Sequence, residues 1–325
     1  MKVLKTLLGI AALSSALFSG VAIAQVYSDK PVKIIVPFPA GGLADNLARG
    51  IADELSKIGS QPVVLDFKPG ANTIIAAEQV ARARPDGYTL LLATDATVSY
   101  NDMLYSKLPY DPTKDFTPIV NIASPGTILV VGESFKGRTL AELIAIAKAN
   151  PGKVSYDSYG LGSGPHLYSE DFAGLAGIKM NHIPFKGVAD LIVAIAGGHV
   201  DIGMIGLAPA IPRVKSGKLR ALVLAAPKRS PLFPDTLTFA ESGFPTFEPS
   251  GWFGLVAPAG TPLAVVDKIA ADVGKIITRA EFEQASITGV GLASMNLGPA
   301  KFAEFIKNDR AAYAVRIKNT NVKLD

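Results

Sequence analysis

Short apolar runs rich in β-branched residues alternate along the chain with longer stretches whose apolar residues recur every three or four positions. The first pattern is typical of buried strands and the second of amphipathic helices. Strands are predicted at 32–38, 62–67, 88–94, 127–131, 153–157, 179–184, 200–205, 219–225 and 253–257. Helices are predicted at 43–58, 73–84, 140–149, 165–176, 189–196, 263–278, 282–288 and 301–318. This alternation indicates an α/β fold built from βαβ units.

Two irregular segments divide the chain. Residues 107–118 and 227–249 are rich in proline, and the part between them has its own strand–helix alternation. The nesting predicts two lobes with a ligand cleft between them. The first lobe is expected to comprise 25–124 together with 227–325, and the second lobe 125–226.

The first 24 residues have the features of a secretory signal peptide. Lys2 and Lys5 precede an apolar stretch at 7–17, and Ala22-Ile23-Ala24 supplies a small-x-small cleavage pattern. The stretch is short for a retained membrane anchor, which is the alternative. We expect cleavage after Ala24 and a periplasmic location.

The composition argues against several functional classes. The net charge of +4 is small and scattered, so nucleic acid is not an expected partner. The absence of cysteine excludes thiol nucleophiles and thiolate metal sites. The three histidines have no metal-ligand spacing, and Ser163 lacks the Gly-x-Ser-x-Gly context of a hydrolase. We therefore predict a protein that is not an enzyme and uses neither a cofactor nor a metal.

The turn Pro39-Ala40-Gly41-Gly42 joins the first strand to the first helix. A helix start carries unpaired N–H groups and partial positive charge, and glycines let a ligand approach that backbone. The expected guest is an anion such as a carboxylate. Asp45, in the first helical turn, could instead accept hydrogen bonds from the same N–H groups.

Three more glycine-bearing turns follow predicted strands: 68–72, 158–166 and 185–187. In parallel α/β sheets such turns gather at the carboxyl ends of the strands, where ligands bind. Each could also be a purely structural turn. Tyr100, Tyr159 and Phe185 lie on or beside these turns and could pack on a ligand or in the core. Asp95 could contact a ligand hydroxyl or ammonium, or cap the following turn, which we favour slightly.

Taken in order, eight motifs resemble the Bug/TctC family, the periplasmic solute-binding proteins of tripartite tricarboxylate transporters. The motifs are PVKIIVPFPAGGLADNLAR, KPGAN, ARPDGYTLLLAT, LPYDPTKDFTPI, SYGLGSGPHL, IPFKG, GGHVDIG and WFGLVAPAGTP, and they span essentially the whole mature chain. The resemblance implies a type II, Venus-flytrap fold that closes over a small di- or tricarboxylate or aromatic acid. It also implies that backbone amides and water hold the carboxylate.

By position, the resemblance assigns ligand contacts to both lobes. The first lobe would contribute Ala40, Gly41, Gly42, Pro69, Gly70 and Ala71, with Asp45 bracing the first turn. The second would contribute Ser158, Gly160, Gly162, Ser163, His166, Lys186 and Gly187, and Asp95 and Phe185 complete the candidate set. Family members commonly have Gly-Gly where this chain has Asn72-Thr73, and often Tyr at Phe185. The residues that contact the far end of the ligand are therefore the ones that the resemblance assigns least well.

Two binding functions remain open from the sequence. The protein could be a monomeric receptor that delivers an organic acid to membrane permease subunits, or a ligand sensor that docks on a sensor kinase. A hydrolase in the same cleft is a third hypothesis, which requires turnover that Ser163→Ala abolishes.

Overall fold

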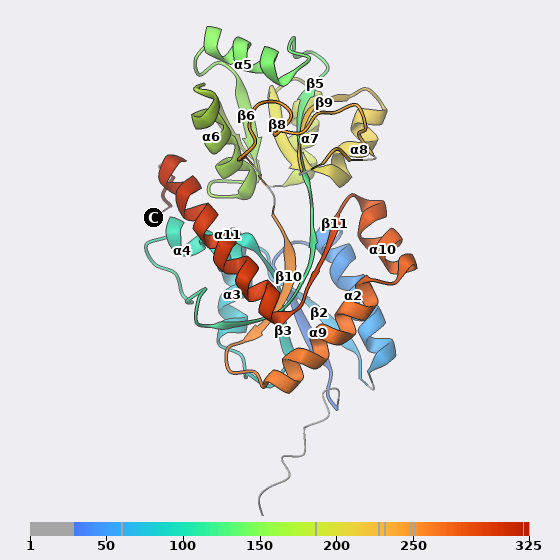
Figure 1. Ribbon diagram of the computed structural model, residues 1–325. Coiled ribbons are helices and arrows are strands. Elements are labelled where there is room, and N and C mark those ends of the chain that lie inside the picture. Colours follow the sequence, from blue (N-terminus) through green and yellow to red (C-terminus); the bar gives the residue numbers. More distant parts are fainter. Residues whose placement is uncertain are drawn as a thin grey trace, which may run out of the picture.

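The computed structural model describes residues 29–59, 61–185, 187–226, 228–230, 232–247, 249, 251–320 and 322–324. Their strands form two separate sheets, and the helices pack around them as two lobes (Figure 1). The predicted signal peptide at 1–24 and the candidate residue Lys186 lie outside the described residues. Within the described part of the chain, no helix is both long and apolar enough to cross a membrane.

The first lobe is built on a six-stranded sheet. Its strands, in spatial order, are β11 (Ala293–Leu297), β4 (Phe116–Ser124), β10 (Phe253–Pro258), β3 (Thr89–Thr94), β1 (Val32–Val36) and β2 (Val63–Phe67). Its helices are α2 (Leu43–Ile58), α3 (Ile74–Ala81), α4 (Asn101–Leu104), α9 (Leu263–Ile277), α10 (Ala280–Ser286) and α11 (Pro299–Thr320). Shorter helical turns are η2 (Ala71–Thr73), the π-helical η3 (Ala96–Tyr100) and η4 (Thr288–Val290).

The second lobe is built on a five-stranded sheet. Its strands, in spatial order, are β7 (Asn181–Pro184), β6 (Ser155–Ser158), β8 (Ile202–Gly206), β5 (Thr127–Gly132) and β9 (Leu219–Ala225). Its helices are α5 (Leu140–Ala149), α6 (Gly164–Ala176), α7 (Val188–Ala196) and α8 (Leu207–Lys215).

Strand β1 has an apolar side chain at every position except Lys33, which is exposed. Ile34 packs in one core cluster with Leu47 and Ile51 of α2, while Ile35 packs in another with Val80 of α3. Successive strand residues point to opposite faces of a sheet, so a strand covered on both faces, as β1 is from Ile34 to Val36, carries apolar residues at consecutive positions. Packing on both faces fixes the orientation of β1 and therefore the position of the Gly41-Gly42 turn that follows it.

Both sheets are mixed rather than purely parallel. β1 pairs in parallel with β2 and β3, but β10 runs antiparallel to both β3 and β4. In the second sheet β6 pairs in parallel with β7 and β8, whereas β5 runs antiparallel to β8 and β9. The parallel part of each sheet carries the glycine-bearing turns.

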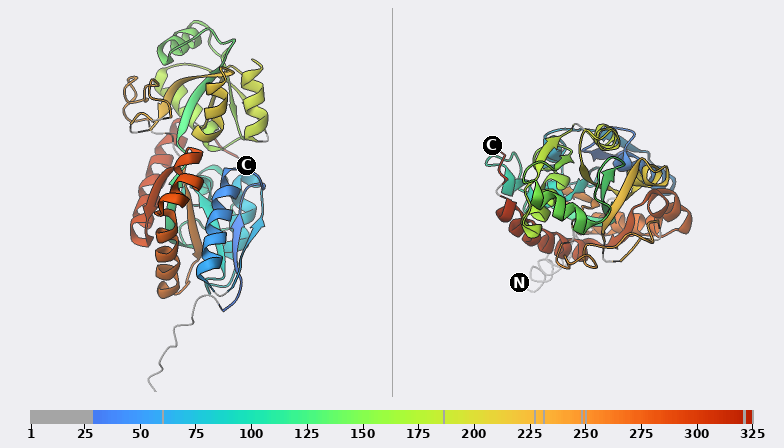
Figure 2. Two further views of the ribbon diagram at one scale, coloured as in Figure 1. Left: turned by 90° about the vertical axis from the view of Figure 1, so that its right-hand side faces the viewer. Right: turned by 90° about the horizontal axis from the view of Figure 1, so that it is seen from above.

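The two lobes share a hydrophobic core on one side. A single cluster contains Tyr156 of β6, Phe172 of α6, and both Tyr313 and Ile317 of α11. Figures 1 and 2 show α11 rising from the first lobe to lie beside α6 of the second. The C-terminal helix therefore ties the lobes together.

The segment that follows β9 also packs on the second lobe. The Leu224 N–H donates to the Leu237 carbonyl at 2.8 Å, and Phe239 and Phe247 lie in the core cluster of Phe172. The sequence placed the lobe boundary at 226/227. These contacts favour a boundary near residue 250, while the boundary at 124/125 stays a prediction.

Candidate ligand-binding site where the two lobes meet

The turn at Gly41 and Gly42 leads into α2 without any side-chain cap. Gly42 is the N-cap residue, and no side chain accepts a hydrogen bond there. Within the described chain, a Cβ on Gly42 would approach only the Pro39 carbonyl oxygen, at 3.9 Å, and one on Gly41 would meet nothing within 4 Å. Ala40, Gly41 and Gly42 are all exposed. The backbone at the start of α2 is therefore accessible to an anion.

Asp45 holds this turn in place. Its Oδ2 accepts a hydrogen bond from the Gly41 N–H at 2.7 Å, and its Oδ1 lies 2.7 Å from Nε of Arg49. Asp45 is 4% exposed, so the pairing with Arg49 compensates the burial of its charge. The bracing role is thus visible in the structure, and Asp45 leaves the following N–H groups to a ligand.

The second turn continues from the carboxyl end of β2. The Lys68 N–H donates to the Val36 carbonyl, which places this turn beside that of Gly42 at one edge of the first sheet. Gly70, Ala71, Asn72 and Thr73 all have positive φ, of 125°, 45°, 47° and 75°. Such angles are rare for residues with a side chain and mark a strained segment.

The turns of the second lobe meet in the same way. β6 and β7 are parallel, and the Phe185 N–H donates to the Ser158 carbonyl at 2.9 Å. Gly160 and Gly187 have no described atom within 4 Å of an added Cβ. Gly187 is the N-cap of α7, again without a side-chain cap hydrogen bond. Two accessible backbone positions therefore lie at one edge of the second sheet.

Ser158 and Ser163 stabilise their own turn. The Ser163 hydroxyl donates to the Gly160 carbonyl at 2.7 Å, and Ser163 is the N-cap of α6 without capping it through its side chain. Ser158 Oγ lies 2.6 Å from Nε2 of His182 and accepts from the Gly160 N–H at 3.0 Å. Both hydroxyls shape the loop, and the N–H groups at the start of α6 remain for a ligand.

His166 is a buried packing residue. Its Nδ1 accepts from the Gly162 N–H at 3.0 Å, and its ring stacks on His182 with centroids 4.2 Å apart. Burial lowers the pKa of both histidines to about 4, so both are neutral near pH 7. His166 thus supports the loop that was expected to contact the ligand.

An added Cβ on Gly70 or Gly162 would meet other side chains, although Gly70 is exposed and Gly162 is buried. A Cβ on Gly70 would lie 2.8 Å from Cδ1 of Ile75, and one on Gly162 would lie 2.3 Å from Cδ1 of Leu324. Close packing explains these glycines without a ligand. Pro69 and Ala71, on either side of Gly70, are exposed.

Asp95 forms the cap that the sequence analysis favoured. Its Oδ1 accepts from the Ala96 N–H at 2.9 Å, and its Oδ2 accepts from the hydroxyls of Tyr313 at 2.5 Å and Tyr168 at 3.2 Å. Burial, with a smaller effect of the Asp309 charge, raises the pKa of Asp95 to about 6. Because both oxygens already accept from protein donors, its contact with a ligand stays an untested prediction.

The aromatic candidates differ in their surroundings. Tyr100 is 1% exposed and packs on Tyr313 with ring centroids 4.4 Å apart, so it belongs to the core. Tyr159 and Phe185 are partly buried against the core of the second lobe. Phe185 is two residues before Gly187, and its contact with a ligand stays a prediction.

Several residues at this junction were not singled out from sequence. Asn72, Asn101, Tyr168 and Tyr313 make hydrogen bonds between segments far apart in the chain. Nothing in their local sequence marks them, except that Asn72 departs from the glycine expected at its position. Asn tolerates left-handed backbone better than most residues, which is the one available signal.

Replacing Tyr313 with phenylalanine should destabilise the chain by about 1–3 kcal/mol, because the buried Asp95 carboxylate loses the shorter of the two hydroxyl hydrogen bonds to its Oδ2. The change removes the hydroxyl that bonds Asp95 and lies 2.8 Å from that of Tyr168. Urea denaturation at pH 7 measures it, with Tyr105→Phe outside this cluster as the control. Equal stability of the Tyr313 variant and the wild type would show that the hydroxyl network contributes nothing.

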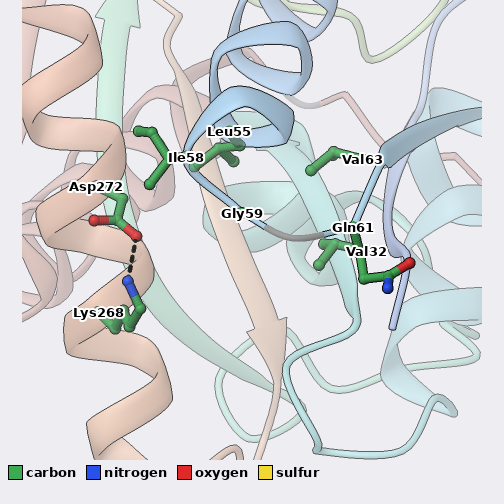
Figure 3. Close-up of a pocket in the computed structure, with 8 residues that line it drawn as sticks. All are labelled: Val32, Leu55, Ile58, Gly59, Gln61, Val63, Lys268 and Asp272. Atoms are coloured by element: carbon green, nitrogen blue, oxygen red, sulfur yellow. Dashed lines mark hydrogen bonds and ion pairs between the residues drawn. The ribbon is translucent and has the colours of Figure 1, made fainter. Parts of the chain in front are cut away.

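A small pocket of about 30 Å³ lies elsewhere in the first lobe (Figure 3). Its lining includes Val32 and Val63, which start β1 and β2, together with Lys268 and Asp272 of α9. The Gly42 and Gly70 turns follow the opposite ends of the same strands. The pocket holds about one water molecule and is no part of the candidate site.

Comparison with known families places the chain in a defined context. The family model described as "Tripartite tricarboxylate transporter family receptor" matches residues 47–322. The "UPF0065 protein in gbd 5'region" of Cupriavidus necator is 39% identical over 265 residues, covering 80% of each chain. "Protein BugT" of Bordetella pertussis is 32% identical over 302 residues, covering 93% of this chain and 92% of its own.

Solved structures agree with these sequence relatives. R. palustris Rpa4515 with adipate superposes with a TM-score of 0.84 at 30% identity, covering 91% of this chain and 99% of that one. MatC from Rhodopseudomonas palustris with bound malate gives 0.80 at 29% identity, covering 89% and 99%. Such relatives are solute-binding proteins rather than enzymes, and the predicted two-lobed α/β fold is confirmed.

Proposed function

This chain belongs to the tripartite tricarboxylate transporter receptor family, and from that membership we propose that it is a periplasmic receptor for a small organic carboxylate. We further propose that it is exported with cleavage after Ala24, acts as a monomer, and delivers its ligand to the permease subunits of such a transporter. No feature of the described residues favours docking on a sensor kinase over transport.

One observation carries the proposal. Gly42, Ser163 and Gly187 begin three helices at the carboxyl ends of parallel strands, and no side chain caps any of them. Each helix start offers unpaired N–H groups and the positive end of a helix dipole. Two of the starts and Gly160 have space where a side chain would be. Uncapped neutral donors of this kind suit a carboxylate.

The chemistry of such a site follows from its donors. Backbone N–H groups give charge-assisted hydrogen bonds to a carboxylate without burying a cationic side chain. When the site is empty, water can satisfy the same groups, so the open protein carries no unpaired buried charge. Closure of the lobes would then remove the ligand from bulk water. We also propose Lys186, from its place in the sequence, as a positively charged ligand contact.

Thermal denaturation of residues 25–325 against mono-, di-, tri- and aromatic carboxylates tests the proposal. Adipate and malate head the panel because similar proteins bind them. A ligand at about 100 times its Kd should raise the stability by about 2.7 kcal/mol. If no acid shifts the transition of a protein that mass spectrometry shows to be empty, the carboxylate proposal fails.

A further inference from the structure

Gly162 is the point at which the ligand loop of the second lobe touches the first lobe. The Gly162 carbonyl accepts a long hydrogen bond, 3.4 Å, from Nδ2 of Asn72. A Cβ at Gly162 would lie 2.3 Å from Cδ1 of Leu324 and 3.0 Å from Cδ1 of Leu104. A side chain at Gly162 would force Leu324 to move and would be strained at φ of 74°, so both effects favour glycine here. The Gly162 N–H donates to Nδ1 of His166.

Asn72 is held from the first lobe by a reciprocal pair of hydrogen bonds. Its Nδ2 donates to Oδ1 of Asn101 at 2.8 Å, and Nδ2 of Asn101 donates to the Asn72 carbonyl at 2.8 Å. Asn101 is fully buried and also bonds the Tyr110 hydroxyl at 3.2 Å. The side chain of Asn72 is therefore aimed at Gly162 by a rigid partner.

The backbone of Asn72 lies in the middle of the left-handed segment 70–73. Within this segment the Thr73 N–H donates to the Gly70 carbonyl at 3.1 Å. The φ values of 45°, 47° and 75° at Ala71, Asn72 and Thr73 are nevertheless costly, so side-chain contacts add to the stability of this conformation. Thr97 Oγ1 donates to Thr73 Oγ1 at 3.0 Å, and the Asn72 side chain adds its hydrogen bonds to Asn101 and Gly162. One of these, to Gly162, exists only while the lobes touch.

We propose that Asn72 is a positioning residue that couples the amide cradle of residues 70–73 to contact between the lobes. The inference rests on the proposed function, since the cradle is one of the turns assigned to the carboxylate. When Gly162 meets Asn72, the left-handed cradle gains a further hydrogen bond and the ligand is retained. When the lobes separate, that bond breaks and the cradle relaxes, so release and opening occur together.

Two variants separate the roles of the two partners, and the chain supplies a matched control for each. Asn72→Gly keeps the backbone free to adopt φ of 47° but removes the side chain, and Asn296→Gly makes the same change at the same φ in β11. Gly162→Ala adds a Cβ that would lie 2.3 Å from Cδ1 of Leu324. Gly177→Ala adds a Cβ at a similar φ, 63°, with no described atom within 4 Å.

Small-angle X-ray scattering of the ligand-free variants measures lobe separation directly. We expect a larger radius of gyration for Asn72→Gly and Gly162→Ala than for the wild type, and no change for Asn296→Gly and Gly177→Ala. Circular dichroism confirms that each variant is folded. An unchanged radius of gyration for both site variants would overturn the contact as a determinant of closure.

Stopped-flow mixing with adipate and with malate tests the coupling to the ligand. Asn72→Gly should release a bound acid about tenfold faster than the wild type, with an unchanged association rate and no effect of Asn296→Gly. Release at the wild-type rate or slower would show that Asn72 merely tolerates its strained backbone, and would overturn the proposal. If the wild type binds neither acid, that result counts against the choice of ligand, and the scattering comparison alone decides on the contact.

Discussion

Replacing Gly42 with valine should abolish high-affinity carboxylate binding in a protein that remains folded. Gly42 has φ of −94° and ψ of −178°, an extended conformation that any residue adopts. Its Cβ position has only the Pro39 carbonyl oxygen, at 3.9 Å, near it in the described chain. The valine methyl groups would instead cover the N–H groups at the start of α2. Losing two charge-assisted hydrogen bonds of about 1.5 kcal/mol each weakens affinity by about 100-fold.

Gly298→Val is a matched control for this change. Gly298 directly precedes α11 and accepts from the Phe302 N–H at 2.8 Å, and an added Cβ would meet no described atom within 4 Å. Calorimetric titration with the acid identified by thermal shift should show wild-type affinity for the control. Wild-type affinity in a folded Gly42→Val protein would place the carboxylate away from α2.

Replacing Asp157 with asparagine should remove a large pH dependence of stability. Asp157 lies on β6 with no exposed surface, and both carboxyl oxygens lack a hydrogen-bond partner among the described residues. A Cβ on Gly203 would lie 2.5 Å from its Oδ2, so β8 packs directly against the carboxyl group. Burial raises its pKa from 3.8 to about 8. The folded chain therefore holds a proton that the unfolded chain releases.

The sign of the effect follows from the proton count. Below pH 4 both states are protonated, and between pH 4 and 8 the unfolded state alone ionises, so stability falls as pH rises. The slope is about 1.4 kcal/mol per pH unit, or about 2.7 kcal/mol between pH 5 and 7. Denaturation in urea across this range should show that fall in the wild type relative to Asp157→Asn. The exposed Asp267→Asn is the control, and parallel profiles for the wild type and Asp157→Asn would refute the prediction.

The bounds of helices and strands could be predicted where glycine, proline or a polar capping residue stands at the end of an apolar pattern. α2, α5 and β9 have the predicted bounds because glycine or proline follows or a polar cap precedes each of them. β4 was missed because Pro118 and Asn121 interrupt its apolar pattern. Its first residues had been assigned to an irregular segment. In the structure, β4 nevertheless pairs with β11 on one side and β10 on the other. α8 was missed because it contains Pro209 and Pro212, and β11 because it is a largely exposed edge strand.

The candidate site was predictable as a set of turns but not as a set of contacts. The order of strand, glycine turn and helix indicated which helix starts lack a side-chain cap. Whether a glycine faces space or protein depends on distant residues, as the contact of Gly162 with Leu324 illustrates. The bonds from Tyr168 and Tyr313 to Asp95 also join remote segments. The departure from Gly-Gly at Asn72-Thr73 was visible in the sequence, but only the structure shows that both residues have positive φ.

The position of β10 in the first sheet has a consequence for how the polypeptide reaches its native state. β10 lies between β3 and β4, although 128 residues separate the end of β4 at Ser124 from the start of β10 at Phe253. The second sheet, by contrast, uses one continuous stretch from Thr127 to Ala225. During synthesis or translocation that stretch can fold first. Until β10 is available, the edges of β3 and β4 that pair with it have unpaired backbone N–H and C=O groups. The interval before β10 emerges is when this protein would most need a chaperone.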